Sequence, residues 1–196
     1  MTTSSTAILR KDHELILRAL ALLERLADRL DPGEAADEPA RKWLLDFFTT
    51  FVDGCHHRKE EQHLFPALEQ RGIPRHGGPV GVMLADHDEG RRMVRALADG
   101  PDRMRGDLIR RYAALLRGHI HTENDVLFVI ADHVLERERQ RELVTAFRTV
   151  EAEVVGPGVH ECLLADLARM ETGAPPMTAR ATAESRAGRG SRPSPT

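Results

Sequence analysis

Two ten-residue blocks of the chain repeat the same order of residue types, and this repeat constrains the fold more than any other feature. The blocks are HHRKEEQHLF, from His56 to Phe65, and HIHTENDVLF, from His119 to Phe128. Each carries a histidine, a glutamate four residues later and then a Leu-Phe pair. On an α-helix, residues i and i+4 lie on one face about one turn apart. An imidazole and a carboxylate so placed can bind one metal ion, and the second carboxylate oxygen can reach another.

A shorter motif precedes each block, KDHE around His13 and ADHDE around His87. Apolar residues at helical spacing predict long helices over about residues 7–30, 39–71, 80–98 and 103–136. Two shorter helices are expected over about 138–154 and up to about residue 170. The sequence therefore predicts an all-α fold, an antiparallel up-down four-helix bundle with additional C-terminal helices packed outside it.

The length of 196 residues suits one domain and a tail. Residues 1–172 are expected to form the bundle and its C-terminal helical extension. From Gly173 onward the chain is rich in Ala, Arg, Ser, Pro and Gly and almost lacks large apolar side chains. Residues 173–196 are therefore expected to be disordered.

Composition argues against several classes of partner. The 28 Lys and Arg residues are outnumbered by 31 Asp and Glu residues, which does not favour binding to nucleic acids or membrane surfaces. The two cysteines form no CxxC motif, and no apolar run is long enough for a signal peptide or a membrane span. We expect a soluble, cytoplasmic protein.

The first block offers two histidine–glutamate pairs at the same spacing, His56 with Glu60 and His57 with Glu61. α-Helical periodicity places His56 on an apolar stripe with Val52, whereas it places His57 beside the polar Asp53. His56 and Glu60 are therefore expected to face the core.

Four histidines lie on apolar stripes in this way, and two glutamates accompany them. A lone histidine on an apolar face is more often a hydrogen-bonded core residue than a metal ligand. Burying six ionisable groups together, however, is costly without a metal ion or a complete hydrogen-bond network. The sequence therefore predicts metal ligands at His13, His56, Glu60, His87, His119 and Glu123. The surface is expected to hold His57, His63, His76, His121 and His133.

The donor types indicate the metal. A structural zinc site usually has four ligands that include cysteine. Six nitrogen and oxygen donors in two matching halves instead favour a dinuclear iron centre, with manganese or zinc as weaker alternatives.

The succession DHE, HHRKEEQHLFP, ADHDEGRR and HIHTENDVLF resembles the hemerythrin-like (HHE cation-binding) domain over about residues 8–135. The later GPGVHE segment resembles the C-terminal extension of a bacterial subgroup. The resemblance implies a four-helix bundle that holds two iron ions, bridged by carboxylates and an oxo or hydroxo group. It also implies the same six ligands. Oxygen-carrying hemerythrins use five histidines, a glutamate and an aspartate. This chain has Glu123 where a carrier has histidine, and no fifth histidine has comparable support, so reversible oxygen transport is not the expected role.

The sequence leaves two possible roles open for each of two further residues, His160 and Tyr112. His160 follows a Gly-Pro-Gly turn, so it is either a further metal ligand or a surface residue at a helix start. Tyr112 precedes His119 by one to two turns and is either a hydrogen-bond donor near the site or ordinary core.

Leu64, Leu127 and nearby phenylalanines are expected to wall the site, admitting O2, H2O2 or NO and excluding larger molecules. The predicted function is a di-iron protein that binds or reacts with such oxidants, with peroxide decomposition as its enzymatic form. The alternatives are a non-enzymatic iron, oxygen or NO sensor, an iron storage or donor module, and a structural bundle with zinc or no metal. Iron-repair relatives typically carry an additional N-terminal domain with cysteines, and none is expected here, which makes iron donation for repair the less favoured alternative.

Overall fold

The computed structural model describes residues 4–30, 37–99, 105–156 and 158–177. Every regular element in these ranges is helical, so the all-α prediction is confirmed. Three of the elements, written η, are π-helices, in which the backbone N–H bonds to the carbonyl five residues earlier. The elements in chain order are α1 (Ser5–Leu30), α2 (Glu38–Asp46), η1 (Phe47–His57), η2 (Glu60–Leu64), α3 (Phe65–Glu69), α4 (Pro79–Asp99), α5 (Arg105–Thr122), η4 (Glu123–Leu127), α6 (Phe128–Val134), α7 (Arg137–Val154) and α8 (Val159–Glu171).

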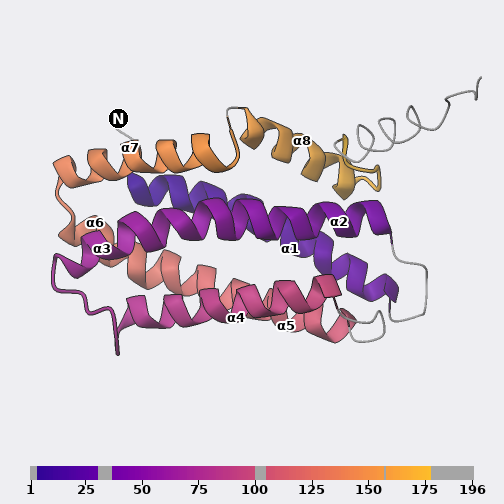
Figure 1. The fold of residues 1–196 in the computed structure, drawn as a ribbon, viewed down its shortest axis with the longest axis horizontal. Coiled ribbons are helices and arrows are strands. Elements are labelled where there is room, and N and C mark those ends of the chain that lie inside the picture. Colours follow the sequence, from indigo (N-terminus) through magenta and orange to yellow (C-terminus); the bar gives the residue numbers. More distant parts are fainter. Residues whose placement is uncertain (1–3, 31–36, 100–104, 157, 178–196) are drawn as a thin grey trace, which may run out of the picture.

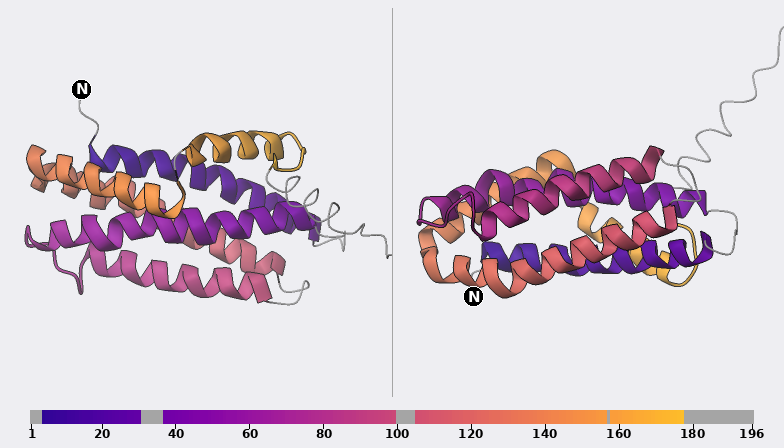
Figure 2. Two further views of the ribbon diagram at one scale, coloured as in Figure 1. Left: turned by 45° about the horizontal axis from the view of Figure 1, so that its top comes forward. Right: turned by 90° about the horizontal axis from the view of Figure 1, so that it is seen from below.

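Four long helical rods lie side by side along the long axis of the molecule (Figures 1 and 2). The first rod is α1 and the third is α4. The second rod runs from α2 to α3 without interruption, and the fourth runs from α5 to α6. Each rod ends near the start of the next, so successive rods run in opposite directions (Figure 1). Helices α7 and α8 lie outside the rods, where α7 contacts α1 and η1 and α8 contacts α1.

Local signals explain where two of the helices begin and end. The side chain of Asp37 accepts a hydrogen bond from the backbone N–H of Ala40 at 3.1 Å, and this N-cap starts α2 with Pro39 in its first turn. Gly156 and Gly158 have φ values of 82° and 77° in the joint between α7 and α8. Such positive φ angles are easily adopted only by glycine.

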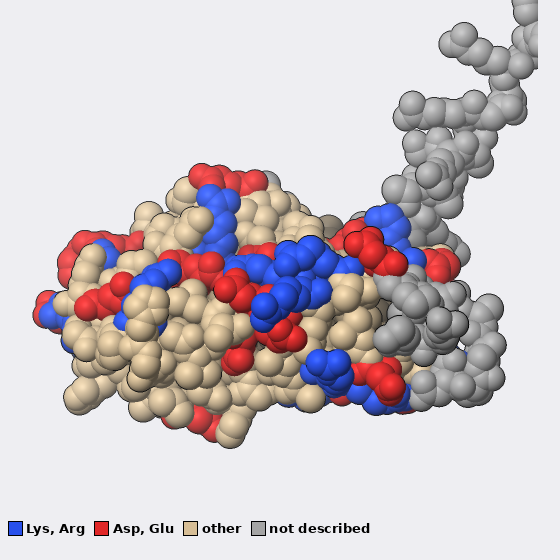
Figure 3. All heavy atoms as spheres, turned by 60° about the horizontal axis from the view of Figure 1, so that its bottom comes forward, with Lys and Arg blue, Asp and Glu red and all other residues tan. Residues whose placement is uncertain are grey.

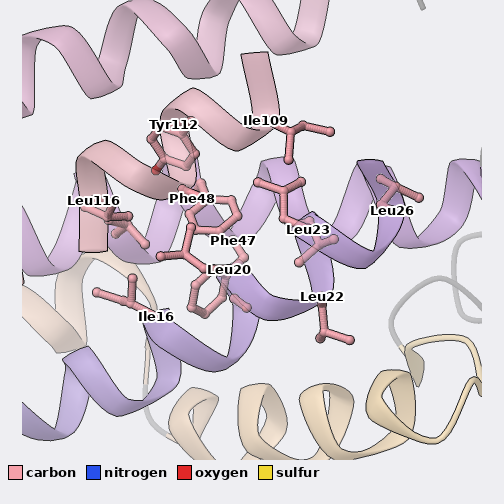
Figure 4. Close-up of a cluster of buried hydrophobic side chains, with 14 of the residues drawn as sticks. Ile16, Leu20, Leu22, Leu23, Leu26, Phe47, Phe48, Ile109, Tyr112 and Leu116 are labelled. Carbon is pink, nitrogen blue, oxygen red and sulfur yellow. The ribbon is translucent and has the colours of Figure 1, made fainter. Parts of the chain in front are cut away.

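The interior contains two apolar clusters with a polar layer between them. The larger cluster, shown in part in Figure 4, gathers side chains from all four rods, among them Leu20, Phe48, Met93 and Leu116. The smaller cluster includes Leu9, Leu64, Phe65, Met83, Leu127 and Phe128. Each rod passes from one cluster to the other, and its predicted metal ligands lie at the crossing. The ligands are therefore enclosed by hydrocarbon along the axis of the rods.

Two of the π-helical elements, η2 and η4, begin at the glutamates predicted to be ligands. The backbone N–H of Phe65 donates to the carbonyl of Glu60, and that of Phe128 donates to the carbonyl of Glu123. These turns are wider than an α-helical turn, so two consecutive residues can both face the interior. The Leu-Phe pair that ends each block is accordingly completely buried in both halves.

The segment predicted to be disordered begins within the described residues. The backbone N–H of Met177 donates to Asp166 at 2.6 Å, and the Arg169 guanidinium donates to the carbonyl of Pro175 at 3.0 Å. Residues 173–177 therefore pack against α8. Residues 178–196, which complete the predicted tail, lie outside the described residues.

The surface mixes both signs of charge. Lysine and arginine side chains alternate with aspartate and glutamate over the face shown in Figure 3. None of the helices in the described ranges has both the length and the apolar character needed to cross a membrane.

Truncation of a core leucine should measure the contribution of the larger cluster. Leu20 is fully buried, so Leu20→Ala should lower the free energy of unfolding by about 2–5 kcal/mol through lost contacts and a residual cavity. The exposed Val129 provides the control, since Val129→Ala should change it by less than about 0.5 kcal/mol. Chemical denaturation followed by circular dichroism gives both values, and equal effects would contradict this description of the core.

Candidate metal centre

The four rods bring all six predicted ligands into one buried group. Each of the six residues is at most 2% exposed, although all six side chains are ionisable. They come from every rod: His13 from the first, His56 and Glu60 from the second, His87 from the third, and His119 and Glu123 from the fourth. Six such groups are not buried together without compensation.

The donor atoms fall into two sets, within each of which the atoms lie no more than 4.8 Å apart. The first donor set consists of His13, His56, Glu60 and Glu123, and the second of Glu60, His87, His119 and Glu123. Both glutamates belong to both sets. Each carboxylate can therefore give one oxygen to each of two cations, as a bridging ligand does.

The ring nitrogens that face the centre lie against each other and against the carboxylates. Nε2 of His13 lies 3.1 Å from Nε2 of His56, and Nε2 of His87 lies 3.2 Å from Nε2 of His119. Oε2 of Glu123 is 3.1 Å from Nε2 of His13 and 3.3 Å from that of His119. None of the four glutamate oxygens accepts a well-aligned hydrogen bond from the described residues. Buried carboxylate oxygens in this condition fit a pair of cations.

The outer ring nitrogens face hydrogen-bond acceptors. An acceptor at Nδ1 keeps the proton there and turns the Nε2 lone pair towards the centre, as in metal sites with a carboxylate behind the histidine. Three of these nitrogens have hydrogen-bond partners: Asn124 for His13 at 3.0 Å, Asp12 for His56 at 3.3 Å and Glu61 for His87 at 2.7 Å. Asp86 lies 3.5 Å from Nδ1 of His119, which makes no well-aligned hydrogen bond to the described residues.

These acceptors follow the repeat. In each half, the aspartate that precedes one histidine ligand faces the next histidine ligand along the chain. The residue after each ligand glutamate faces a histidine of the other half. None of these four neighbours was predicted from the sequence. Each is directly adjacent in sequence to a predicted ligand, and this adjacency is the feature that could have identified it.

The surroundings shift the pKa values of the two carboxylates in opposite directions. Burial raises the pKa of Glu60, and the charge of Glu123 raises it further. Burial acts on Glu123 in the same direction, but the adjacent His119 outweighs it and holds its pKa well below the ordinary value. Burial tends to lower the pKa of His119, yet Glu123 and Asp86 raise it to about 9. Cations bound between the carboxylates would compete with protons for them.

The prediction that His57 lies on the surface is wrong. His57 is only 4% exposed, and its ring stacks on that of His87 with centroids 3.8 Å apart. Its ring nitrogens lie with those of His87 and His119 in a third set of grouped donors. The error has a structural cause. Residues Phe47–His57 are π-helical, so the α-helical period used to choose between His56 and His57 does not hold there, and both turn inward.

His160 is not brought into any of these donor sets. Nε2 of His160 lies 3.5 Å from Asp12, and Nδ1 lies 3.5 Å from Glu151. Its side chain is 29% exposed, and its ring packs edge-to-face on Phe51. His160 thus lies next to Asp12, which contacts the predicted ligand His56.

Tyr112 belongs to the larger apolar cluster. Its ring packs edge-to-face on Phe48 at 5.2 Å, and burial raises the pKa of its hydroxyl. This position supports the interpretation of Tyr112 as core.

The other histidines expected at the surface are consistent with that expectation. His76, His121 and His133 are exposed, and His63 is half-buried. His121 also pairs with Asp125 at i+4, at 3.0 Å, but its side chain is 77% exposed. Spacing alone therefore does not distinguish a ligand pair from a surface ion pair.

Comparison with known proteins gives three findings. The model of the hemerythrin HHE cation binding domain matches residues 4–131. The iron-sulfur cluster repair protein DnrN of Neisseria gonorrhoeae is 36% identical over 86 residues, which cover 37% of this chain and 54% of that protein. The uncharacterized protein Rv1995 of Mycobacterium tuberculosis is 24% identical over 174 residues, which cover 83% of this chain and 67% of that protein. No solved structure matches the chain significantly.

The matched residues contain the first three rods, all but the last three residues of the fourth, and all six predicted ligands. The chain spans about half the length of DnrN, so the likeness to that protein concerns a part of it. The extent of the family match and the two donor sets agree, and the chain belongs to the hemerythrin HHE cation-binding domain family.

Proposed function

We propose that the chain holds two iron ions, one in each donor set, and that this centre binds and reacts with small oxidants such as O2, H2O2 or NO. The observation that carries the proposal is the pair of buried glutamates shared by both donor sets, whose four oxygens lack well-aligned hydrogen bonds. Two cations between Glu60 and Glu123 would satisfy these oxygens.

Iron is favoured over other cations by the donor types. Imidazole and carboxylate together suit iron and manganese, whereas structural zinc usually takes four ligands that include thiolate. Cys55 is buried, but its sulfur is not a member of the grouped donors, and burial raises the pKa of its thiol to about 11. A thiolate ligand is therefore not available from Cys55.

The two donor sets offer unequal numbers of ligands. Both share the two glutamates and have two histidines each, but His57 lies beside the histidines of the second set only. With His57 as a ligand, the second metal has three imidazoles and the first has two. The first metal then keeps a position that a small exogenous molecule can occupy.

Side chains around the centre limit the size of that molecule. The four residues of the two Leu-Phe pairs are completely buried, and their phenylalanine rings stack on histidine ligands, Phe128 on His13 and Phe65 on His87. Only a molecule of a few atoms fits such an enclosure. Two ferrous ions would supply the two electrons that reduction of a peroxide requires, so a peroxide-decomposing enzyme is the version to test first.

A second candidate is an iron donor or store, and the likeness to DnrN favours it, because that protein is named for iron-sulfur cluster repair. Burial of all six ligands opposes rapid donation, since the metal could leave only if the rods separate. A third candidate is a sensor, in which the same centre would bind O2 or NO without turnover.

Metal analysis tests the shared glutamates. The protein from iron-rich cells should contain two iron ions per chain, and Glu60→Ala should reduce this to one or none because Glu60 belongs to both donor sets. His121→Ala is a matched control, since it removes a histidine of the same i,i+4 spacing from the surface and should retain two iron ions. Less than one iron ion in the unmodified chain would refute the proposed centre.

Replacement of His57 tests the unequal ligation. His57→Leu should weaken binding of the iron ion in the second donor set by about 10-fold or more, leave the ion in the first set unaffected, and shift the near-ultraviolet absorption of the ferric protein. His63→Leu, at a half-buried position away from the donor sets, should leave the spectrum unchanged. An unchanged spectrum in His57→Leu would show that His57 is not a ligand.

Reactivity separates the candidate roles. Gas evolution after H2O2 is added to the iron-loaded protein, lost in Glu60→Ala, is expected for the enzyme. Reversible O2 or NO spectra without turnover would identify a sensor instead. Transfer of iron to a chelator or an apoprotein at a useful rate, without either behaviour, would favour the donor role.

A further inference from the structure

A buried lysine lies directly behind one of the two donor sets. The side chain of Lys59 is completely buried, and its Nζ lies 3.0 Å from Oδ2 of Asp12 and 3.3 Å from Oε2 of Glu151. A lysine is almost never fully buried unless it is paired. Asp12 is completely buried too, and its Oδ2 also lies 3.3 Å from Nδ1 of the ligand His56. Lys59 therefore contacts the acceptor that orients a predicted ligand.

The C-terminal helices complete the surroundings of this acceptor. Glu151 comes from α7 and His160 from the first turn of α8. Nε2 of His160 lies 3.5 Å from the second oxygen of Asp12, a contact without a well-aligned hydrogen bond, and its Nδ1 lies 3.5 Å from Glu151. Both residues follow position 131, where the family match ends. The extension is thus in contact with the centre through Asp12.

The other half of the repeat is built differently. Asp86 occupies the corresponding place beside His119, but its side chain is 27% exposed to solvent. The residue that aligns with Lys59 is Thr122, whose hydroxyl donates to the carbonyl of Gly118 in its own helix. One orienting carboxylate is therefore solvated, whereas the other is enclosed and balanced by a buried cation.

We propose that Lys59, Glu151 and His160 are positioning residues through which the α7–α8 extension holds Asp12 and so directs His56 towards the metal of the first donor set. This inference rests on the proposed two-metal centre. Lys59 balances the buried charge of Asp12, and His160 blocks its rotation on the other side. Without them, Asp12 no longer holds the ring of His56, and the first metal loses affinity while the second does not.

Stepwise titration of the metal-free, full-length chain with Co²⁺ tests the inference. Calorimetry and visible absorption should resolve two binding steps, which His56→Ala and His119→Ala assign to the first and second donor sets. Lys59→Met and His160→Leu should weaken the first-set step by about 10–100-fold and alter its absorption band, with the second step unchanged. Asp86→Asn should weaken only the second-set step. His160→Gln, which keeps an N–H donor, should recover most of the affinity lost in His160→Leu.

Arg58→Met is the matched control. Arg58 is the sequence neighbour of Lys59 and pairs with Glu153 of α7 at 2.9 Å, so its removal loosens the same helix contact without touching Asp12. Both binding steps should remain unchanged in this variant. A weakened first step in Arg58→Met equal to that in Lys59→Met would overturn the inference, because general loosening of α7 would then be sufficient.

The remaining outcomes are also decisive. If circular dichroism shows that Lys59→Met does not fold, His160→Leu and Glu151→Gln, each at a side chain 29% exposed, replace it in the same titration. Two unchanged steps in these variants, or two steps weakened equally, would overturn the positioning role while leaving the two-metal centre intact. Fewer than two equivalents bound by the unmodified chain would instead overturn the proposed function and this inference with it.

Discussion

The structure depends on the burial of two carboxylates at one place. Glu60 and Glu123 meet between two apolar clusters, where solvent cannot screen their mutual repulsion, and four histidines close around them. Isolated charges in such surroundings cost several kcal/mol each unless opposite charge is supplied. Without cations, a raised pKa of Glu60 and the contact of Glu123 with His119 at 3.3 Å lower this cost. Bound cations would supply the opposite charge, so the rods would be held together at their middle by coordination bonds as well as by the flanking hydrocarbon.

The repeat explains how one short motif produces a complete environment. Each half supplies two histidines and one glutamate, and each half also supplies the acceptors that orient rings in its own half and in the other. The two halves therefore cannot form their sites independently. Differences at a few positions break the approximate symmetry: His57 aligns with Ile120, and Lys59 aligns with Thr122. These substitutions give the two donor sets different neighbours within the same fold.

Much of this arrangement could be predicted from the sequence, for reasons that also explain the errors. Helical periodicity located every long helix within a few residues, and it placed six ionisable side chains on apolar stripes, where only a shared site makes their burial reasonable. The same periodicity failed at His57, because an assumed 3.6-residue turn cannot describe a π-helical segment. Asp12 and Asp86 were missed because orientation of a ligand ring leaves no periodic signal. The contact of His160 with Asp12 could not be predicted because the two residues are far apart in the sequence and meet only through the packing of α8.

The wide turns at the two glutamates make the spacing within each block a constraint separate from its chemistry. The turn from Glu60 to Phe65 already contains one residue more than an α-helical turn, so insertion of a further residue there would rotate everything beyond it by about 100° around the helix axis. The phenylalanine that stacks on His87 would then point elsewhere, although every residue type needed for the site would still be present. In this family member, insertions inside the blocks should accordingly be far more damaging than most substitutions there, whereas the connection between Glu69 and Pro79 can absorb changes in length.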